Sequence, residues 1–92
     1  MSVLFLDKLD YSLCGVEVPG YTSTDLNIEI SESLKEIIIW GERKDEFGGD
    51  SFKSIIKYMP PHIEIKDAKV ENGFLTFKIF PIEIRHQKIE IK

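Results

Sequence analysis

The sequence predicts an all-β protein, an immunoglobulin-like antiparallel sandwich, from two features of its pattern. Apolar and polar residues alternate over short stretches, which places the apolar side chains on one face of a strand. Turn residues separate these stretches at roughly regular intervals, giving about seven short strands, the pattern typical of a sandwich. The 92 residues are enough for one domain with a single modest core.

Three strands are expected in the first half of the chain. Residues 12–18 alternate and place Cys14 on one face with two valines. Residues 26–31 also alternate, as in a sheet with one buried and one solvated face. Residues 36–40 form a continuous apolar run with three isoleucines, whose branched side chains favour a central strand. We interpret the segment between the second and third strands as a tight loop.

The second half predicts another strand and a hairpin. Residues 51–59 are rich in β-branched and aromatic side chains, and Pro60-Pro61 ends that strand because proline cannot donate to the ladder. Asn72-Gly73 lies between two alternating segments, the strongest short-range signal for a hairpin with a primed turn. The residues expected in the core are Val16, Val18, Ile38, Trp40, Leu75 and Phe77.

Composition argues against two classes of partner. The formal net charge is −4 and the basic residues do not cluster, so a nucleic-acid role is not expected. No apolar run is long enough to span a bilayer, so we expect no membrane partner. Cys14 is the single cysteine, which excludes an internal disulfide and favours a reducing, cytoplasmic location. We expect its thiol to be a small buried apolar group.

The sequence offers no convergent chemistry, so we expect no enzyme. His62 follows two prolines and His86 lies in a polar segment, and neither has metal ligands at zinc spacing around it. Gly48-Gly49 lacks the strand-to-helix context of a phosphate-binding loop. Carboxylates are scattered, as is usual in an acidic β protein. No catalytic residue, cofactor site or metal site is predicted.

Several motifs, taken in order, resemble one family. The pattern Ala-x-x-x-Asn-Gly-x-Leu at residues 68–75 is similar to the last hairpin of the alpha-crystallin domain of small heat-shock proteins. Residues 15–21 contain a similar "PG" turn, and residues 37–43 a strand that ends in "GER". The order and spacing agree from about Tyr11 to Ile91. The run 62–73 is most similar to bacterial inclusion-body-binding members.

The chain departs from the family pattern in three places. Only residues 1–10 precede the first matching strand, where the family usually has a long apolar arm. Residues 45–50 are too few for the long loop that swaps a strand between bacterial subunits. An arginine expected on the next strand is absent, with Ile55 and Ile56 in that region. We therefore divide the chain into an arm or edge strand (1–10), an alpha-crystallin-like domain (11–80) and a tail (81–92).

The resemblance implies an ATP-independent holdase that binds unfolded or aggregation-prone proteins. It implies a groove between the strand that carries Leu26, Ile28 and Ile30 and the strand that carries Ala68 and Val70. In the family, a C-terminal Ile-x-Ile tail fills this groove on a neighbouring subunit.

Here the tail motif is Ile89-Glu90-Ile91, whose two isoleucines point the same way in an extended chain. The polar spacer before it favours docking on a neighbour. The alternative is a last strand of the chain's own sheet, because Ile82 and Ile84 show the same alternation a few residues earlier.

The short 45–50 connection also bears on self-association. A dimer is expected to pair residues 51–59 of two chains edge to edge, giving a dimer or small oligomer. The residues expected on that dimer strand are Phe52, Ile55, Ile56 and Tyr58. Two other interpretations stay open: a compact interaction module like the CS-domain co-chaperones, and a structural component of a larger assembly.

Overall fold

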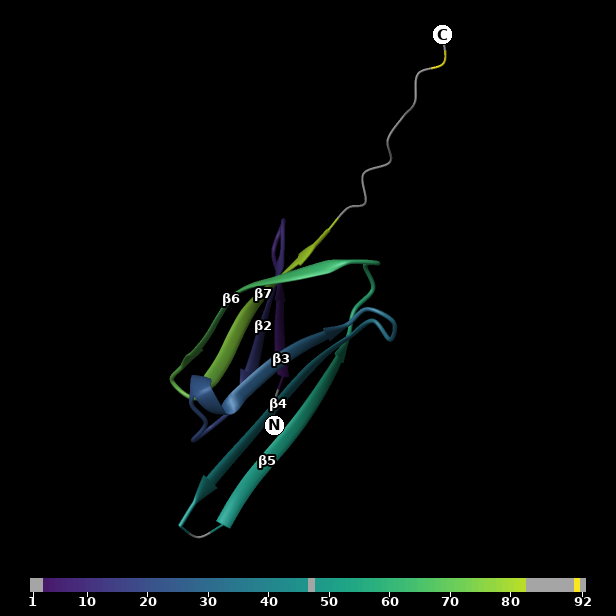
Figure 1. Cartoon of the computed structure of the whole chain (residues 1–92). Helices are drawn as coiled ribbons and strands as arrows, with labels where there is room; N and C mark the ends of the chain where they lie inside the picture. Colours follow the sequence, from purple (N-terminus) through teal and green to yellow (C-terminus); the bar gives the residue numbers. More distant parts are fainter. Residues whose placement is uncertain (1–2, 47, 83–90, 92) are drawn as a thin grey trace.

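The computed structural model describes residues 3–46, 48–82 and 91. Within that part, the chain forms seven strands and one short 3-10 turn (Figure 1). In chain order the elements are β1 (Val3–Asp7), β2 (Ser12–Glu17), η1 (Ser23–Asp25), β3 (Leu26–Ser31), β4 (Glu36–Asp45), β5 (Gly48–Lys57), β6 (Ile63–Glu71) and β7 (Phe74–Pro81).

The strands form two antiparallel sheets with their core between them. One sheet has the order β1-β2-β7-β6, and the other has the order β3-β4-β5. Alternating side chains of β2 and β7 meet alternating side chains of β4. The largest fully buried side chains are Phe77, Ile37, Ile39, Val16, Val18 and Cys14. The predicted all-β sandwich is therefore confirmed.

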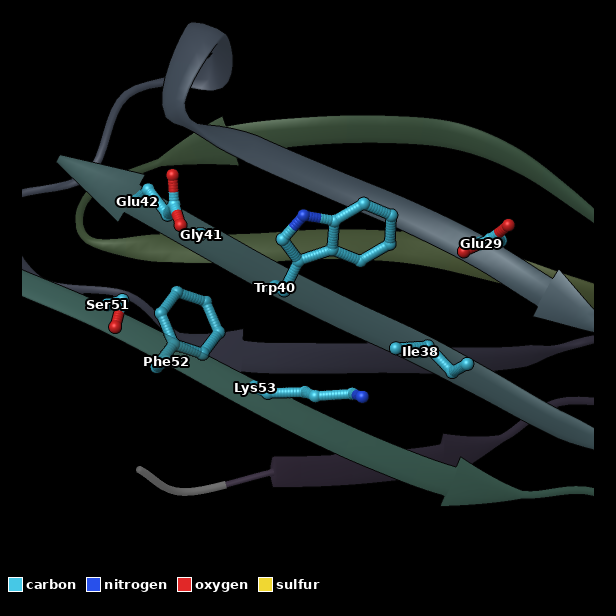
Figure 2. A pocket seen from close by; sticks show the side chains of 8 residues that line it. All are labelled: Glu29, Ile38, Trp40, Gly41, Glu42, Ser51, Phe52 and Lys53. Atoms are coloured by element: carbon cyan, nitrogen blue, oxygen red, sulfur yellow. The ribbon is translucent and has the colours of Figure 1, made fainter.

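Strand β4 corrects part of the predicted core. Ile37 and Ile39 are fully buried, whereas Ile38 and Trp40 lie on the outer face of the sheet and are only half-buried (Figure 2). The prediction chose the wrong parity, because the continuous apolar run of β4 carries no alternation that marks its inner face. The other four expected core residues are buried: Val16 on β2, Val18 just after β2, and Leu75 and Phe77 on β7.

Strands β4 and β5 form one long hairpin, longer than the sequence pattern indicated. Their pairing runs from Glu36↔Lys57 to Asp45↔Gly48. The predicted strand 51–59 was therefore wrong at both ends, since β5 begins at Gly48 and ends at Lys57. The segment 45–50 belongs mostly to the ladder because two glycines do not prevent backbone pairing. Figure 1 shows the two strands side by side along their length.

The hairpin of β6 and β7 turns where the sequence predicted. Asn72 and Gly73 have φ values of 52° and 80°, and Glu71 pairs with Phe74 on either side of them. A type I′ turn requires positive φ at both central residues, which asparagine and glycine tolerate best.

The N-terminal end of the described chain belongs to a sheet, whereas the C-terminal end leaves the sheet after β7. Val3–Asp7 forms β1, an edge strand that pairs with β2. After β7, the backbone N–H of Ile82 still donates to the carbonyl of His62, at 2.9 Å. Ile84 and Ile89 lie outside the described residues, and Ile91 is 93% exposed and belongs to no strand.

Candidate binding groove

A small apolar groove lies along the side of the sandwich where the edge strands β3 and β6 approach each other. Its volume is about 240 Å³. That is below the roughly 300–1,000 Å³ typical of small-molecule sites. Its lining residues are Ser23, Leu26, Ile28, Ala68, Lys69, Val70 and Leu75.

The β3 wall follows from strict alternation. Leu26 and Ile28 point to the inner side and are half-buried, while Asn27 and Glu29 are exposed. Alternate residues of a strand point to opposite faces, so one apolar row is presented to the groove. Ile30 continues this row but packs against the core and does not line the groove.

The β6 wall depends on a β-bulge. The pairing with β7 shifts between Lys66 and Lys69, and Asp67 has a φ of 56°. Ile65 and Val70 are an odd number of residues apart, so a regular strand would place them on opposite faces. The bulge restores them to one face, because it inserts an extra residue into one strand of the pair. Val70 is thereby turned toward the groove.

The floor and rim of the groove differ in character. Leu75 of β7 is buried, with 4% exposure, and closes the floor. Lys69 lies at the rim, with its Nζ 3.3 Å from a carboxylate oxygen of Glu71. The groove therefore presents branched apolar surface beside an ion-paired rim, which suits side chains of an extended apolar segment.

The structure brings together four of the five residues expected at the groove: Leu26, Ile28, Ala68 and Val70. Sequence reasoning missed Ser23, Lys69 and Leu75. The odd spacing between Ile65 and Val70 was the available signal for the bulge that exposes Ala68 and Lys69. Nothing in the pattern places Ser23 at the end of the groove.

The residues expected at the dimer strand lie on or just after β5, which is an edge of its sheet. Ile56 and Tyr58 face the core and are buried. Phe52 is half-buried and packs edge-on against Tyr21, with ring centroids 5.0 Å apart. Only Ile55 points outward, with 52% exposure. Edge pairing through β5 would therefore rely mainly on backbone hydrogen bonds.

Two reactive side chains in the described residues are Cys14, which is buried in the core, and His62, which lies at the surface. Burial raises the pKa of the Cys14 thiol to about 11, so it stays protonated at neutral pH. His62 Nδ1 lies 3.8 Å from an oxygen of Glu32 on the surface. Residues 3–46, 48–82 and 91 contain no group of three potential metal ligands. No helix in the described part of the chain is long and apolar enough to cross a membrane.

Several solved structures with the same architecture are small heat-shock proteins. One from Xylella fastidiosa superimposes with a TM-score of 0.74 at 18% identity, covering 99% of this chain and 94% of that chain. The chain folds as an alpha-crystallin domain. HSP18.5 from E. histolytica gives a TM-score of 0.68 at 21% identity, with 98% and 96% covered. Heat shock protein 16.0 from Schizosaccharomyces pombe gives 0.67 at 23% identity, with 99% and 80% covered.

The match is structural. No family profile and no curated protein sequence matches the chain. The resemblance indicated by the motifs is thus confirmed for the alpha-crystallin fold, with the turn at Asn72-Gly73 in the expected place. The β4–β5 connection of this alpha-crystallin domain is a hairpin closed within one chain.

Proposed function

We propose that this alpha-crystallin domain is an ATP-independent holdase that binds unfolded or aggregation-prone proteins. The observation that supports this most is the apolar groove between β3 and β6, which is open to an extended apolar segment. A holdase needs exposed apolar surface rather than catalytic groups. The edge strand β1 adds such surface, since Leu4, Phe5 and Leu6 are 60%, 52% and 52% exposed. The single buried Cys14 suits a reducing compartment such as the cytoplasm.

Aggregation assays test the proposal directly. A heat-denatured client should stay soluble when the chain is present at about equal molar ratio, without added nucleotide. Ala68→Trp should fill the groove and reduce this protection, whereas Ala68→Ser is the matched control that leaves it open. Both changes fall on the exposed side of the bulge, so the fold should survive. Undiminished aggregation with the parent chain would reject the holdase proposal.

The tail motif Ile89-Glu90-Ile91 is proposed to dock in the groove of a neighbouring subunit. Burying each branched side chain contributes about 1.5–3 kcal/mol, before the cost of ordering the tail. The contact is therefore reversible, which lets the tail and a client segment compete for one groove.

Replacing Ile89 and Ile91 with serine should lower the assembly state in size-exclusion runs while the melting temperature of the dilute chain stays unchanged. Glu90→Ser is the control within the same tail. Only a contact between subunits makes stability depend on concentration. Coincident elution across a dilution series, with a lowered melting temperature, would instead assign the tail to the chain's own sheet.

Self-association through the β5 edge is proposed as the basis of a dimer or small oligomer. The hairpin closes within one chain, so β5 keeps an edge that can pair with its copy around a two-fold axis. The Xylella fastidiosa small heat-shock protein has a distinct high order structure. Light scattering should give a small assembly, and a large defined oligomer would contradict this arrangement.

The closed hairpin also favours a second candidate, a compact interaction module that binds folded partners. Its pairing from Glu36↔Lys57 to Asp45↔Gly48 leaves no long loop to exchange between subunits. The same aggregation assay separates the two functions, because an interaction module gives no protection to a denatured client.

A further inference from the structure

The outer face of the sheet β3-β4-β5 carries an apolar patch, here called the outer patch, formed by Ile38, Trp40 and Ile55. Trp40 is half-buried, and Ile55 is 52% exposed. Figure 2 shows Trp40 and Ile38 on β4, between Glu29 of β3 and Lys53 of β5. A hollow of about 570 Å³ lies beside Trp40 and is lined by all of these residues except Ile55.

Charge is distributed unevenly around the outer patch. The register pairs Ile38 with Glu29 on the β3 side and with Ile55 on the β5 side. Lys53 and Lys57 lie two residues away from Ile55 in either direction along β5, on the same face. Beside the outer patch, the β3 side of the face therefore carries an acid and the β5 side carries two bases, and Glu42 of β4 is a further exposed acid that lines the hollow.

Two of these charges remain available for a partner. Lys57 Nζ lies 3.4 Å from an oxygen of Glu36. Glu29 and Lys53 take part in none of the ion pairs found among the described residues, and both side chains are exposed. An acid and a base on opposite sides of one apolar patch make that face complementary to itself under a suitable rotation.

Only one orientation of a two-fold axis uses this complementarity. An axis parallel to β4, between two stacked faces, lays β3 of each copy over β5 of the other. Glu29 of one copy then lies above Ile55 of the other, between Lys53 and Lys57, each about 7 Å along the strand. An axis across the strands at the level of Ile38 instead lays β3 over β3 and β5 over β5, so that Glu29 meets Glu29 and Lys53 meets Lys57.

We propose that the outer patch is a self-association surface, in which two copies of this chain stack face to face around a two-fold axis parallel to β4. The occupant is a second copy because a closed two-fold contact puts the same patch on both partners and pairs acid with base twice. Trp40 lies on β4, the central strand of the sheet, and tryptophan anchors are usually found near the centre of an interface. This surface is separate from the β3–β6 groove and from the backbone edge of β5.

Trp40 is the only tryptophan in the chain, so its fluorescence reports this surface directly. In the full chain, its emission should move to shorter wavelength with rising concentration, in parallel with the mass measured by sedimentation velocity. Glu29→Lys and Lys53→Glu should each move the midpoint to about tenfold higher concentration. The double variant Glu29→Lys/Lys53→Glu should return the midpoint to within about threefold of the parent, because it restores opposite charges.

Glu17→Lys is the matched control, since it makes the same change of charge at an exposed site on the other sheet and should leave the midpoint in place. Three results would overturn the proposal. Trp40 emission could stay constant while the mass rises, or the double variant could behave no better than the single variants. The shift could also occur only when a denatured client is added to dilute monomer, which would make a client segment the occupant.

Discussion

The two long hairpins of this sandwich differ in how clearly the sequence encodes their geometry. In β6–β7, the pair Asn72-Gly73 sets the turn, and alternation on β7 identifies Leu75 and Phe77 as core residues. In β4–β5, the apolar run has no alternation and the turn has no strong dipeptide, so both parity and boundaries were predicted wrongly. A strand's position can be read from composition, whereas its inner face requires a periodic pattern or a turn.

The proposed surfaces, the β3–β6 groove and the outer patch, also differ in how clearly the sequence indicates them. The β6–β7 hairpin contributes Val70, which the family resemblance had indicated for the groove, and Leu75, which it had not. The β4–β5 hairpin contributes the β5 edge, which the sequence had indicated, and the outer patch around Trp40, which became visible only once the register was known. The misread strand thus carries the surface that the sequence did not reveal.

The parity of β4 predicts the largest effect. Ile39→Ala should lower the free energy of unfolding by about 2–5 kcal/mol, because it leaves a cavity in the core. Ile38→Ala, the neighbouring and chemically identical change, should cost about 1 kcal/mol or less, since that side chain lies on the outer face. Urea unfolding monitored by circular dichroism measures both. If Ile38→Ala lost as much free energy of unfolding as Ile39→Ala, or more, Ile38 would belong to the core as the sequence predicted.

The groove shows which features of the fold could be predicted from the sequence and which could not. Leu26 and Ile28 could be assigned because β3 alternates strictly, and Ala68 and Val70 followed from the family motif. The bulge at Asp67 reverses the parity of β6, and the odd spacing between Ile65 and Val70 indicates it only once both residues are known to pack against the core. Lys69 reaches the rim for the same reason. Ile89 lies outside the described residues, so its docking remains a prediction.

The pairing of β2 with β7 can be tested by titration, because Cys14 of β2 lies opposite Phe77 of β7. Burial raises the pKa of this thiol from 9.0 to about 11. The folded chain therefore holds its proton more tightly than the unfolded chain, and the stabilisation is complete below pH 9 and decreases as pH rises toward 11. Between pH 9 and 10.5, the free energy of unfolding should fall by about 1–2 kcal/mol through this group.

Cys14→Ala is the control for this titration. It has a lower stability throughout, but its stability should decline less steeply over the same pH range. Other groups titrate there as well, so the comparison is the difference in slope between the two chains. Parallel slopes would show that the thiol is not buried against β7, and rapid reaction of the folded parent with a thiol reagent at pH 8 would agree with that result.

The smallest expected effect concerns the turn between β3 and β4, which contrasts with Asn72-Gly73. Lys35 has a φ of 52°, in the left-handed region that costs an ordinary L-residue about 1–2 kcal/mol. Lys35→Gly removes that cost but adds about 0.5–1 kcal/mol of backbone entropy, so stability should rise by about 0.5 kcal/mol. The carbonyl of Lys35 still accepts from the N–H of Tyr58 in either variant. The urea midpoint should increase at unchanged m-value, while Lys35→Ala, which keeps the strain, should not raise it. An equal increase for alanine would attribute the gain to loss of the lysine side chain and not to the turn.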